Sequence, residues 1–154
     1  MSEILEGQTL VIKNALSLRA KLSEQEFSHL GPFIDDYFMK TGASNAGCTL
    51  TANHEIITRN ENTYIDFEIR VSVNKKIEPP QGFTFEDEFT LENCLSLDCG
   101  GVPDNIMTQV NLLAQYIKEN NLTPRTPVYS VTYGNINDTH QASNIKLFVG
   151  VSKT

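Results

Sequence analysis

The sequence lacks a surplus of positive charge. Its 154 residues include 12 lysines and arginines against 19 aspartates and glutamates, so the formal net charge is -7. Nucleic-acid phosphates are bound by clustered lysine and arginine side chains, so this balance argues against binding to nucleic acid. It permits a cationic small molecule or a basic protein as partner.

Long apolar runs are also missing. The longest fall far short of the roughly 20 residues that a helix needs to cross a bilayer. The first residues, Met-Ser-Glu-Ile-Leu-Glu-Gly, have neither the basic start nor the apolar run of a secretory signal. We therefore expect a cytoplasmic protein with no membrane contact.

Motifs that carry chemistry are scarce. The three cysteines are an odd number, without the Cys-x-x-Cys spacing of a zinc site or the pattern of a disulfide framework. The histidines, His29, His54 and His140, are scattered without metal-ligand spacing, and no Gly-x-Ser-x-Gly turn is present. We expect reduced thiols, no metal, no cofactor and no catalytic residue.

The clearest pattern that is present lies in residues 64–73, where apolar and polar residues alternate. Successive side chains of a strand point to opposite faces, so this pattern predicts a strand with one apolar and one charged face. The apolar positions are Ile65, Phe67, Ile69, Val71 and Val73, and the polar face carries Tyr64, Asp66, Glu68, Arg70 and Ser72. Residues 144–152 alternate in the same way, with Ile145, Leu147, Val149 and Val151 on one side.

The first half predicts a strand, a helix and a hairpin. Alternation predicts a strand within residues 5–22, and Ser23 with Glu26 forms the capping-box pattern of a helix start. Apolar residues at helical spacing continue to about Gly42, but Gly31-Pro32 predicts a kink or two short helices. A loop over 41–47, a strand over 48–58 and a turn over 59–62 then lead into the strand 64–73.

The second half repeats this order. Residues 74–82, with Pro79 and Pro80, predict a linker between the halves, and residues 83–97 predict one long strand or two. Pro103 and Asp104 suit the start of a helix that ends near residue 120. Strands over 128–133 and 144–152, with the loop 134–143 between them, complete the pattern. We expect an α+β protein: one domain over 1–154, made of a duplicated β-α-β-β unit with repeats at about 5–78 and 83–154.

This order of elements resembles the gyrase-inhibitor-like fold, also called the bacterial transcription-activator effector-binding domain. Residues 15–19, Ala-Leu-Ser-Leu-Arg, and residues 94–98, Cys-Leu-Ser-Leu-Asp, echo each other, as expected for a duplication. The segment 128–133, a loop containing Asp138 and the segment 145–153 are similar to the closing hairpin of that family. The chain also resembles a branch of uncharacterised Firmicute proteins found near type VII secretion toxin clusters.

The resemblance implies one mainly antiparallel, curved sheet with helices on one face and a ligand cleft on the other. Ligands in the family are small and are often cationic or aromatic. Several members carry a glutamate in the first strand of the final hairpin, for cation binding or hydrolysis. Here that strand has Ser130 and Thr132 and no carboxylate, which weakens both roles at this position. No DNA-binding module precedes the first strand, so we do not expect a one-chain transcription factor.

Two groups of residues are candidates for ligand binding. On the strand 64–73, Asp66 and Glu68 can hold a cation and Tyr64 can stack on it, beside Arg70. The alternative is a solvated strand face with internal Glu–Arg pairing. The acidic cluster Glu86, Asp87, Glu88 and Glu92 is expected to be a solvated face or a contact for a basic protein.

The second group comes from the closing hairpin. Tyr129, Val131 and Tyr133 share one strand face, and they line a pocket or pack on the helix; Val131 is expected in the core. Phe148 lies on the face opposite Leu147 and is a cleft wall or an interface contact. Gly150, on the same face as Phe148, leaves room for a ligand or another backbone.

Three functions follow from these observations. The first is a non-enzymatic domain that binds a small hydrophobic or aromatic, possibly cationic, ligand in the cleft of the sheet. The second is a protein-interaction role, for example as the partner of a secreted toxin. The third, a small hydrolase on the same fold, is the least supported because the usual carboxylate is missing. A monomer and a homodimer are both compatible with the sequence.

Overall fold

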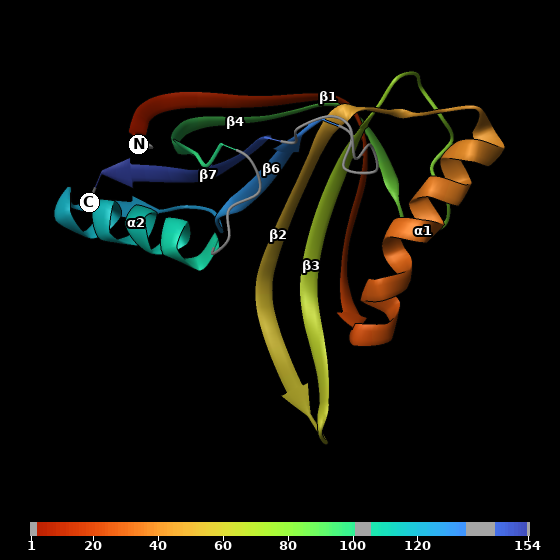
Figure 1. Ribbon diagram of the computed structural model, residues 1–154, viewed down its shortest axis with the longest axis horizontal. Helices are drawn as coiled ribbons and strands as arrows, with labels where there is room; N and C mark the ends of the chain where they lie inside the picture. Colours follow the sequence, from red (N-terminus) through yellow and green to blue (C-terminus); the bar gives the residue numbers. More distant parts are fainter. Residues whose placement is uncertain (1–2, 101–105, 135–143, 154) are drawn as a thin grey trace. The chain divides into compact units, whose positions relative to one another are not determined.

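The chain forms two compact units in the computed structural model, which describes residues 3–100, 106–134 and 144–153 (Figure 1). The central unit consists of residues 12–88, and the terminal unit consists of residues 1–11 together with 89–154. The described residues contain seven strands and two helices, and every pairing within a unit is antiparallel. The α+β fold class is confirmed.

The central unit is built on a three-stranded antiparallel arrangement. Strand β1 (Ile4–Ser23) pairs with β3 (Asn62–Val73), which pairs on its other side with β2 (Asn45–Arg59). Helix α1 (Glu24–Thr41) connects β1 to β2. The predicted order of strand, helix, strand, strand is confirmed.

Helix α1 begins and ends as the sequence predicts. The Ser23 hydroxyl accepts from the backbone N–H of Glu26, whose carboxylate accepts from the backbone N–H of Ser23. Gly42, with a φ of 70°, adopts the left-handed conformation that closes many helices. The expectation of two short helices is wrong, since α1 continues through Pro32. Ile34 and Phe38 follow Pro32 and are buried in the core. Their packing stabilises the helix and offsets the loss of the hydrogen bond that a proline removes.

The β2–β3 hairpin is longer than expected. Strand β2 starts at Asn45, inside the segment that we expected to be a loop. The turn is formed by Asn60 and Glu61, whose φ angles of 51° and 67° suit a two-residue hairpin turn. Irregularities in the register occur between Asn45 and Thr49 and between Asn53 and Glu55. A bulge changes which way the following side chains point, and this matters for the site below.

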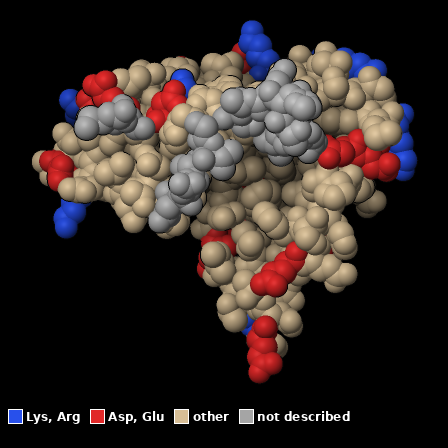
Figure 2. Space-filling model, in the orientation of Figure 1, with Lys and Arg blue, Asp and Glu red and all other residues tan. Residues whose placement is uncertain are grey.

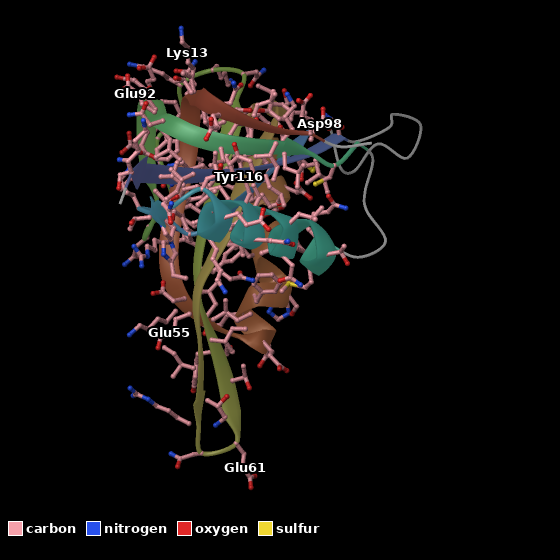
Figure 3. All side chains as sticks on the ribbon, turned by 90° about the vertical axis from the view of Figure 1, so that its left-hand side faces the viewer. Lys13, Glu55, Glu61, Glu92, Asp98 and Tyr116 are labelled. Atoms are coloured by element: carbon pink, nitrogen blue, oxygen red, sulfur yellow. The ribbon has the colours of Figure 1, made fainter. Side chains whose placement is uncertain are left out.

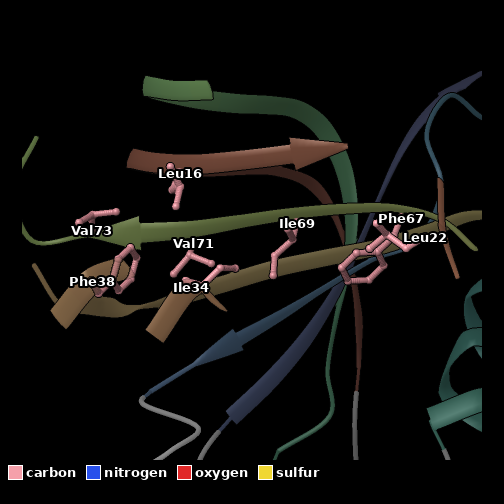
Figure 4. Packing of buried hydrophobic residues seen from close by; sticks show 8 residues of the cluster. All are labelled: Leu16, Leu22, Ile34, Phe38, Phe67, Ile69, Val71 and Val73. Atoms are coloured by element: carbon pink, nitrogen blue, oxygen red, sulfur yellow. The ribbon is translucent and has the colours of Figure 1, made fainter. Parts of the chain in front are cut away.

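The apolar face of β3 packs against α1 and forms the core of the central unit (Figure 4). The buried members of this cluster are Leu16, Leu22, Ile34, Phe38, Phe67, Ile69, Val71 and Val73. The segment between β3 and β4 packs on the same helix, because Phe83 stacks on Phe33 at 5.8 Å between ring centroids. The predicted apolar face of residues 64–73 is therefore a core face.

The terminal unit combines the start of β1 and four further strands with helix α2 (Ile106–Glu119). Strand β4 (Thr84–Asp98) is one long strand, and β7 (Asn144–Lys153) pairs with β4, β5 (Leu122–Pro124) and β6 (Tyr129–Tyr133). The division between the units falls within β1 and within β4. The predicted helix start at Pro103 and Asp104 and the loop residues 135–143 lie outside the described residues.

The core of the terminal unit lies between α2 and one face of β4 and β7. Its buried members are Leu95, Leu97, Leu113, Leu147 and Val149, with Val110, Tyr116 and Ile117 of α2 packed against them. The alternation predicted for residues 144–152 is thus confirmed as burial of one strand face against a helix. Among the described residues, no helix is long and apolar enough to cross a membrane.

Candidate ligand site on the central unit

The polar face of β3 points away from α1. Phe67, Ile69 and Val71 pack into the cluster with the helix, so the residues between them must point to the opposite side of the strand. This face carries Tyr64, Asp66, Glu68, Arg70 and Ser72. Four of the predicted site residues therefore share one surface of one strand.

Glu68 is the centre of a hydrogen-bonded network on this face, and only 5% of its surface is exposed. Its Oε1 atom lies 2.6 Å from Nε2 of His54, and its Oε2 atom accepts from Nη1 of Arg70. Arg70 also donates from Nε to Oε1 of Glu86, at 2.8 Å. Buried carboxylates are tolerated where they are paired and hydrogen-bonded, as Glu68 is here.

Asp66 forms a separate pair at the next position of the same face. The Arg19 guanidinium donates from Nε and Nη2 to its two carboxylate oxygens, each at 3.3 Å. The hydrogen bonding from Arg19 lowers the pKa of Asp66, although desolvation opposes it. Asp66 and Arg19 therefore neutralise each other beside the Glu68 network.

The pKa of His54 lies below its ordinary value in this environment. Desolvation, and then the positive charge of Arg19, lower the pKa of His54, while Asp66 acts in the opposite direction. A neutral imidazole that carries its proton on Nε2 can donate to Glu68. His54 then contributes a hydrogen bond to Glu68 without contributing a positive charge.

The network joins two carboxylates through one guanidinium. Arg70 contacts both Glu68 and Glu86. The side chains of Glu68 and Arg70 are only 6% and 13% exposed, so water screens their charges poorly. Two carboxylates therefore lie close together on this face of the strand.

Tyr64 lies on the same face but nearer the hairpin turn. Glu68 is four positions further along the chain, about 13 Å along an extended strand. It lines a depression of about 390 Å³ together with Lys21, Ile57, Arg59, Asn60 and Asn62. The structure therefore places Asp66, Glu68 and Arg70 in one cluster and Tyr64 at its outer edge.

The predicted aromatic residues lie on the terminal unit. Tyr129 is directly opposite Phe148 in the β6–β7 pairing, and both are 6% exposed. The Phe89 ring meets Tyr129 edge to face at 6.2 Å between centroids. Because Leu147 and Val149 face α2, Phe148 and Tyr129 lie on the other side of the sheet. This excludes packing on α2 for Tyr129.

Tyr133, two residues further along β6, has a different neighbour. The Lys146 ammonium lies 6.0 Å from the centroid of its ring, at the limit of a cation–π contact. Val131, between the two tyrosines, is fully buried, as expected. Strands β6 and β7 thus carry two nearly buried aromatic side chains, Tyr129 and Phe148. The cation Lys146 lies near the third aromatic side chain, Tyr133.

Gly150 does leave room for another part of the chain. A Cβ atom at this position would lie 3.0 Å from Cγ2 of Thr126, and the backbone N–H of Gly150 donates to Oγ1 of Thr126 at 2.8 Å. The Thr126 side chain therefore fills the space beside Gly150.

Sequence reasoning missed two members of the Glu68 network. His54 belongs to no recognisable motif in the sequence. The strand register shifts between Asn53 and Glu55, on either side of His54, and no sequence pattern predicts this shift. Glu86 was expected on a solvated face, but it binds Arg70; its neighbour Asp87 does lie exposed, paired with Lys76 at 3.1 Å. An arginine two residues after a glutamate on a strand was the only local signal for the network.

The described residues contain no cluster of three or more His, Cys, Asp or Glu side chains that could hold a metal ion. The free cysteines, Cys48, Cys94 and Cys99, are all shielded enough from water that desolvation raises the pKa of each thiol. Raised thiol pKa values are typical of unreactive cysteines.

Comparison with protein-family models and with curated proteins finds no match. Solved structures do match. The EcmrR C-terminal domain has a TM-score of 0.65 and 16% identity, over 100% of this chain and 98% of that one. The chain has the fold of a bacterial effector-binding domain. In an EcmrR–DNA complex the same fold gives a TM-score of 0.68 at 16% identity, and this chain spans 58% of that EcmrR chain.

Two proteins from Listeria innocua share the fold more distantly. An uncharacterised conserved protein has a TM-score of 0.55 at 10% identity, covering 98% of this chain and 92% of its own. A protein described as a hydrolase has a TM-score of 0.52 at 9% identity, covering 98% of this chain and 91% of its own. At such identities the likeness concerns the fold and not the chemistry.

Proposed function

We propose that this chain is a non-enzymatic domain that binds a small, aromatic or hydrophobic cation, with Glu68 as the residue that recognises the positive charge. The observation that carries this proposal is the buried carboxylate of Glu68 on the sheet face opposite α1, where Arg70 holds a second carboxylate, Glu86, beside it. Two carboxylates at one place attract a cationic group. The effector-binding fold supports a binding role over a catalytic one.

Asp66 and Arg70 have positioning roles in this proposal. Arg70 joins Glu68 to Glu86, so it keeps both carboxylates on the same face. Asp66 pairs with Arg19 beside the Glu68 network. Tyr64, at the outer edge of the face, is proposed to stack on the aromatic part of the ligand.

We propose Tyr129, Tyr133 and Phe148 as contacts for an apolar or aromatic ligand on the terminal unit by itself. Aromatic side chains bury large areas and orient flat ligands. Tyr129 and Phe148 stand opposite each other in the β6–β7 register, and their role is tested by Phe148→Leu, which keeps an apolar side chain and removes the ring.

The binding proposal is tested by isothermal titration of the pure chain with tetraphenylphosphonium, and with triphenylphosphine oxide as a neutral aromatic control. We expect the cation to bind and the neutral compound to bind at least tenfold more weakly. Glu68→Gln is expected to weaken cation binding at least tenfold, a change of about 1.4 kcal/mol. The matched control is Glu55→Gln, an exposed carboxylate on β2 of the same hairpin (Figure 3).

Equal cation affinity in Glu68→Gln and the wild-type chain would overturn the assignment of Glu68. Loss of affinity in Glu55→Gln as well would point instead to the general negative charge of the hairpin, whose acidic side chains are visible in Figure 2. Both variants are first checked for a cooperative thermal transition without ligand, so that a loss of affinity is not a loss of the fold.

The exposed apolar side chains of α1 favour a protein-interaction role as the second candidate. Met39 is 81% exposed and Phe33 is 46% exposed on this helix. Exposed apolar side chains that gather on one surface often mark a protein contact. Two results together would favour this role over ligand binding. The chain would bind no cation, and a protein partner would be retained by the wild-type chain but not by Met39→Lys.

A further inference from the structure

A cavity of about 550 Å³ lies within the terminal unit, away from the Glu68 network. Its lining comes from the start of β1, from β4, from β5 and its following residues, and from the end of β7. The lining residues are Glu6, Gly7, Asn93, Leu95, Leu122, Arg125, Val151, Ser152 and Lys153. This volume falls in the range of about 300–1,000 Å³ that small-molecule sites occupy.

The cavity forms where the pairing between β4 and β7 stops. The last paired residues are Cys94 and Gly150, and the Arg125 side chain bridges the two strands beyond them. Its Nε atom donates to the carbonyl of Val151 at 3.1 Å, and its Nη2 atom donates to the carbonyl of Glu92 at 3.0 Å. Arg125 thus replaces the missing strand pairing and keeps the two strands apart.

The path of Arg125 depends on Gly150. A Cβ atom at Gly150 would lie 3.6 Å from Nη2 of Arg125, so the guanidinium runs directly beside the glycine backbone. The backbone N–H of Arg125 also donates to the carbonyl of Gly150, at 2.7 Å. These contacts hold the guanidinium in one place, and a fixed guanidinium loses little entropy when it binds an anion.

The charge of this cavity is opposite to that of the chain as a whole. Arg125 and Lys153 contribute two positive charges, while Glu6 contributes one negative charge. Glu6 also interacts with Tyr116 of α2, whose pKa is raised by desolvation and by a hydrogen bond with Glu6 (Figure 3). A guanidinium has five N–H donors, and Arg125 uses two of them on the strand carbonyls of the described residues.

We propose that this cavity binds a small organic carboxylate with an apolar tail. The carboxylate lies between Arg125 and Lys153, and the tail packs on Leu122 and Val151. Arginine and lysine bind carboxylates through charge-assisted hydrogen bonds, which are about twice as strong as neutral ones. Burial of the tail against the apolar side chains adds a favourable free energy of about 0.8 kcal/mol for each CH₂ group that leaves water.

The proposal is tested by titrating the full chain with octanoate, followed by calorimetry and by amide chemical shifts. Octanol and acetate are the controls, because the first lacks the charge and the second lacks the tail. We expect octanoate to bind, to shift the amide signals of Leu122, Val151 and Lys153, and to bind at least tenfold more tightly than either control. Signals of the Glu68 face are expected to stay in place, so the outcome is independent of the proposed cation site.

Two variants assign the binding to this cavity. Lys153→Gln removes one cation from an exposed position and is expected to weaken octanoate binding at least fivefold without unfolding the chain. The matched control Lys118→Gln removes an exposed cation from α2 of the same unit and is expected to leave the affinity unchanged. Leu122→Phe keeps both cations, fills part of the cavity and is expected to weaken octanoate more than acetate.

Three results would overturn the proposal. The first is no octanoate binding at millimolar concentration. The second is equal loss of affinity in Lys153→Gln and Lys118→Gln, which would show attraction to general surface charge. The third is octanol binding as tightly as octanoate, which would show an apolar site without anion recognition.

Discussion

The imidazole of His54 and the carboxylate of Glu68 meet at 2.6 Å although they belong to different strands and lie 14 positions apart. Glu68 stands opposite Ala52 in the register of β2 and β3, and the irregularity between Asn53 and Glu55 lies next to that pair. An additional residue in a strand redirects the side chains around it. The irregularity therefore accounts for His54 reaching Glu68 from the neighbouring strand.

The first prediction concerns pH. Desolvation and Arg19 lower the pKa of His54 below its ordinary value of 6.5, so below that pH the unfolded chain binds a proton more readily than the folded chain. The stability that neutral His54 contributes is complete above pH 6.5 and is lost as the pH falls below it. Urea unfolding at pH 7.5 and pH 5.5 should show a larger loss for the wild-type chain than for His54→Gln. An equal loss in both chains would show that other groups control this dependence.

The second prediction concerns the pairing of Glu68 with Arg70. Glu68→Leu removes a carboxylate partner of Arg70, which is 13% exposed and also contacts Glu86, and it removes the carboxylate that His54 contacts. Removal of one partner of a buried pair costs about 3–5 kcal/mol. The double variant Glu68→Leu with Arg70→Met should be less destabilised than the sum of the single variants by about 1 kcal/mol or more. Additive effects in denaturant unfolding would show that the two side chains are energetically independent.

The sequence was sufficient to predict the elements of this fold where burial follows a local period. The alternation around Phe67 and Ile69 identified a core strand, and the capping box of Ser23 and Glu26 identified the helix start. Both signals depend on residues within a few positions of each other. The fold resemblance rested on the order of these elements, and the solved structures confirm it.

The network around Glu68 could be predicted only in part. Asp66, Glu68 and Arg70 share a face because they are two residues apart on one strand, which the sequence shows directly. His54 and Glu86 join them from other strands, and their positions depend on strand register. Register follows from packing and bulges along the whole sheet, so no local pattern contained it. At Pro32 the sequence predicted a kink or two short helices, but α1 continues through this residue, because packing of Ile34 and Phe38 outweighs a local propensity.

The third prediction concerns the start of α1. Ser23→Ala removes the hydroxyl that accepts from the backbone N–H of Glu26, and it should lower the free energy of unfolding by about 1 kcal/mol. Ser28→Ala is the control, since the Ser28 hydroxyl donates to the Gln25 carbonyl within the helix and caps no free N–H group. The control should change stability by no more than about 0.5 kcal/mol. Similar losses in the two variants would show that the cap contributes nothing specific.

The fourth prediction concerns the space beside Gly150. Gly150→Ala brings a methyl group to 3.0 Å from Cγ2 of Thr126, tighter than nine in ten such contacts in folded proteins, and should lower the stability by about 1–3 kcal/mol. Thr126→Ser removes that methyl group and keeps the hydroxyl that accepts from the backbone N–H of residue 150. The double variant should therefore recover most of the loss, as measured by the midpoint of urea unfolding. If Thr126→Ser fails to rescue Gly150→Ala, the loss comes from the contact with Arg125, and the guanidinium rather than the threonine requires the glycine.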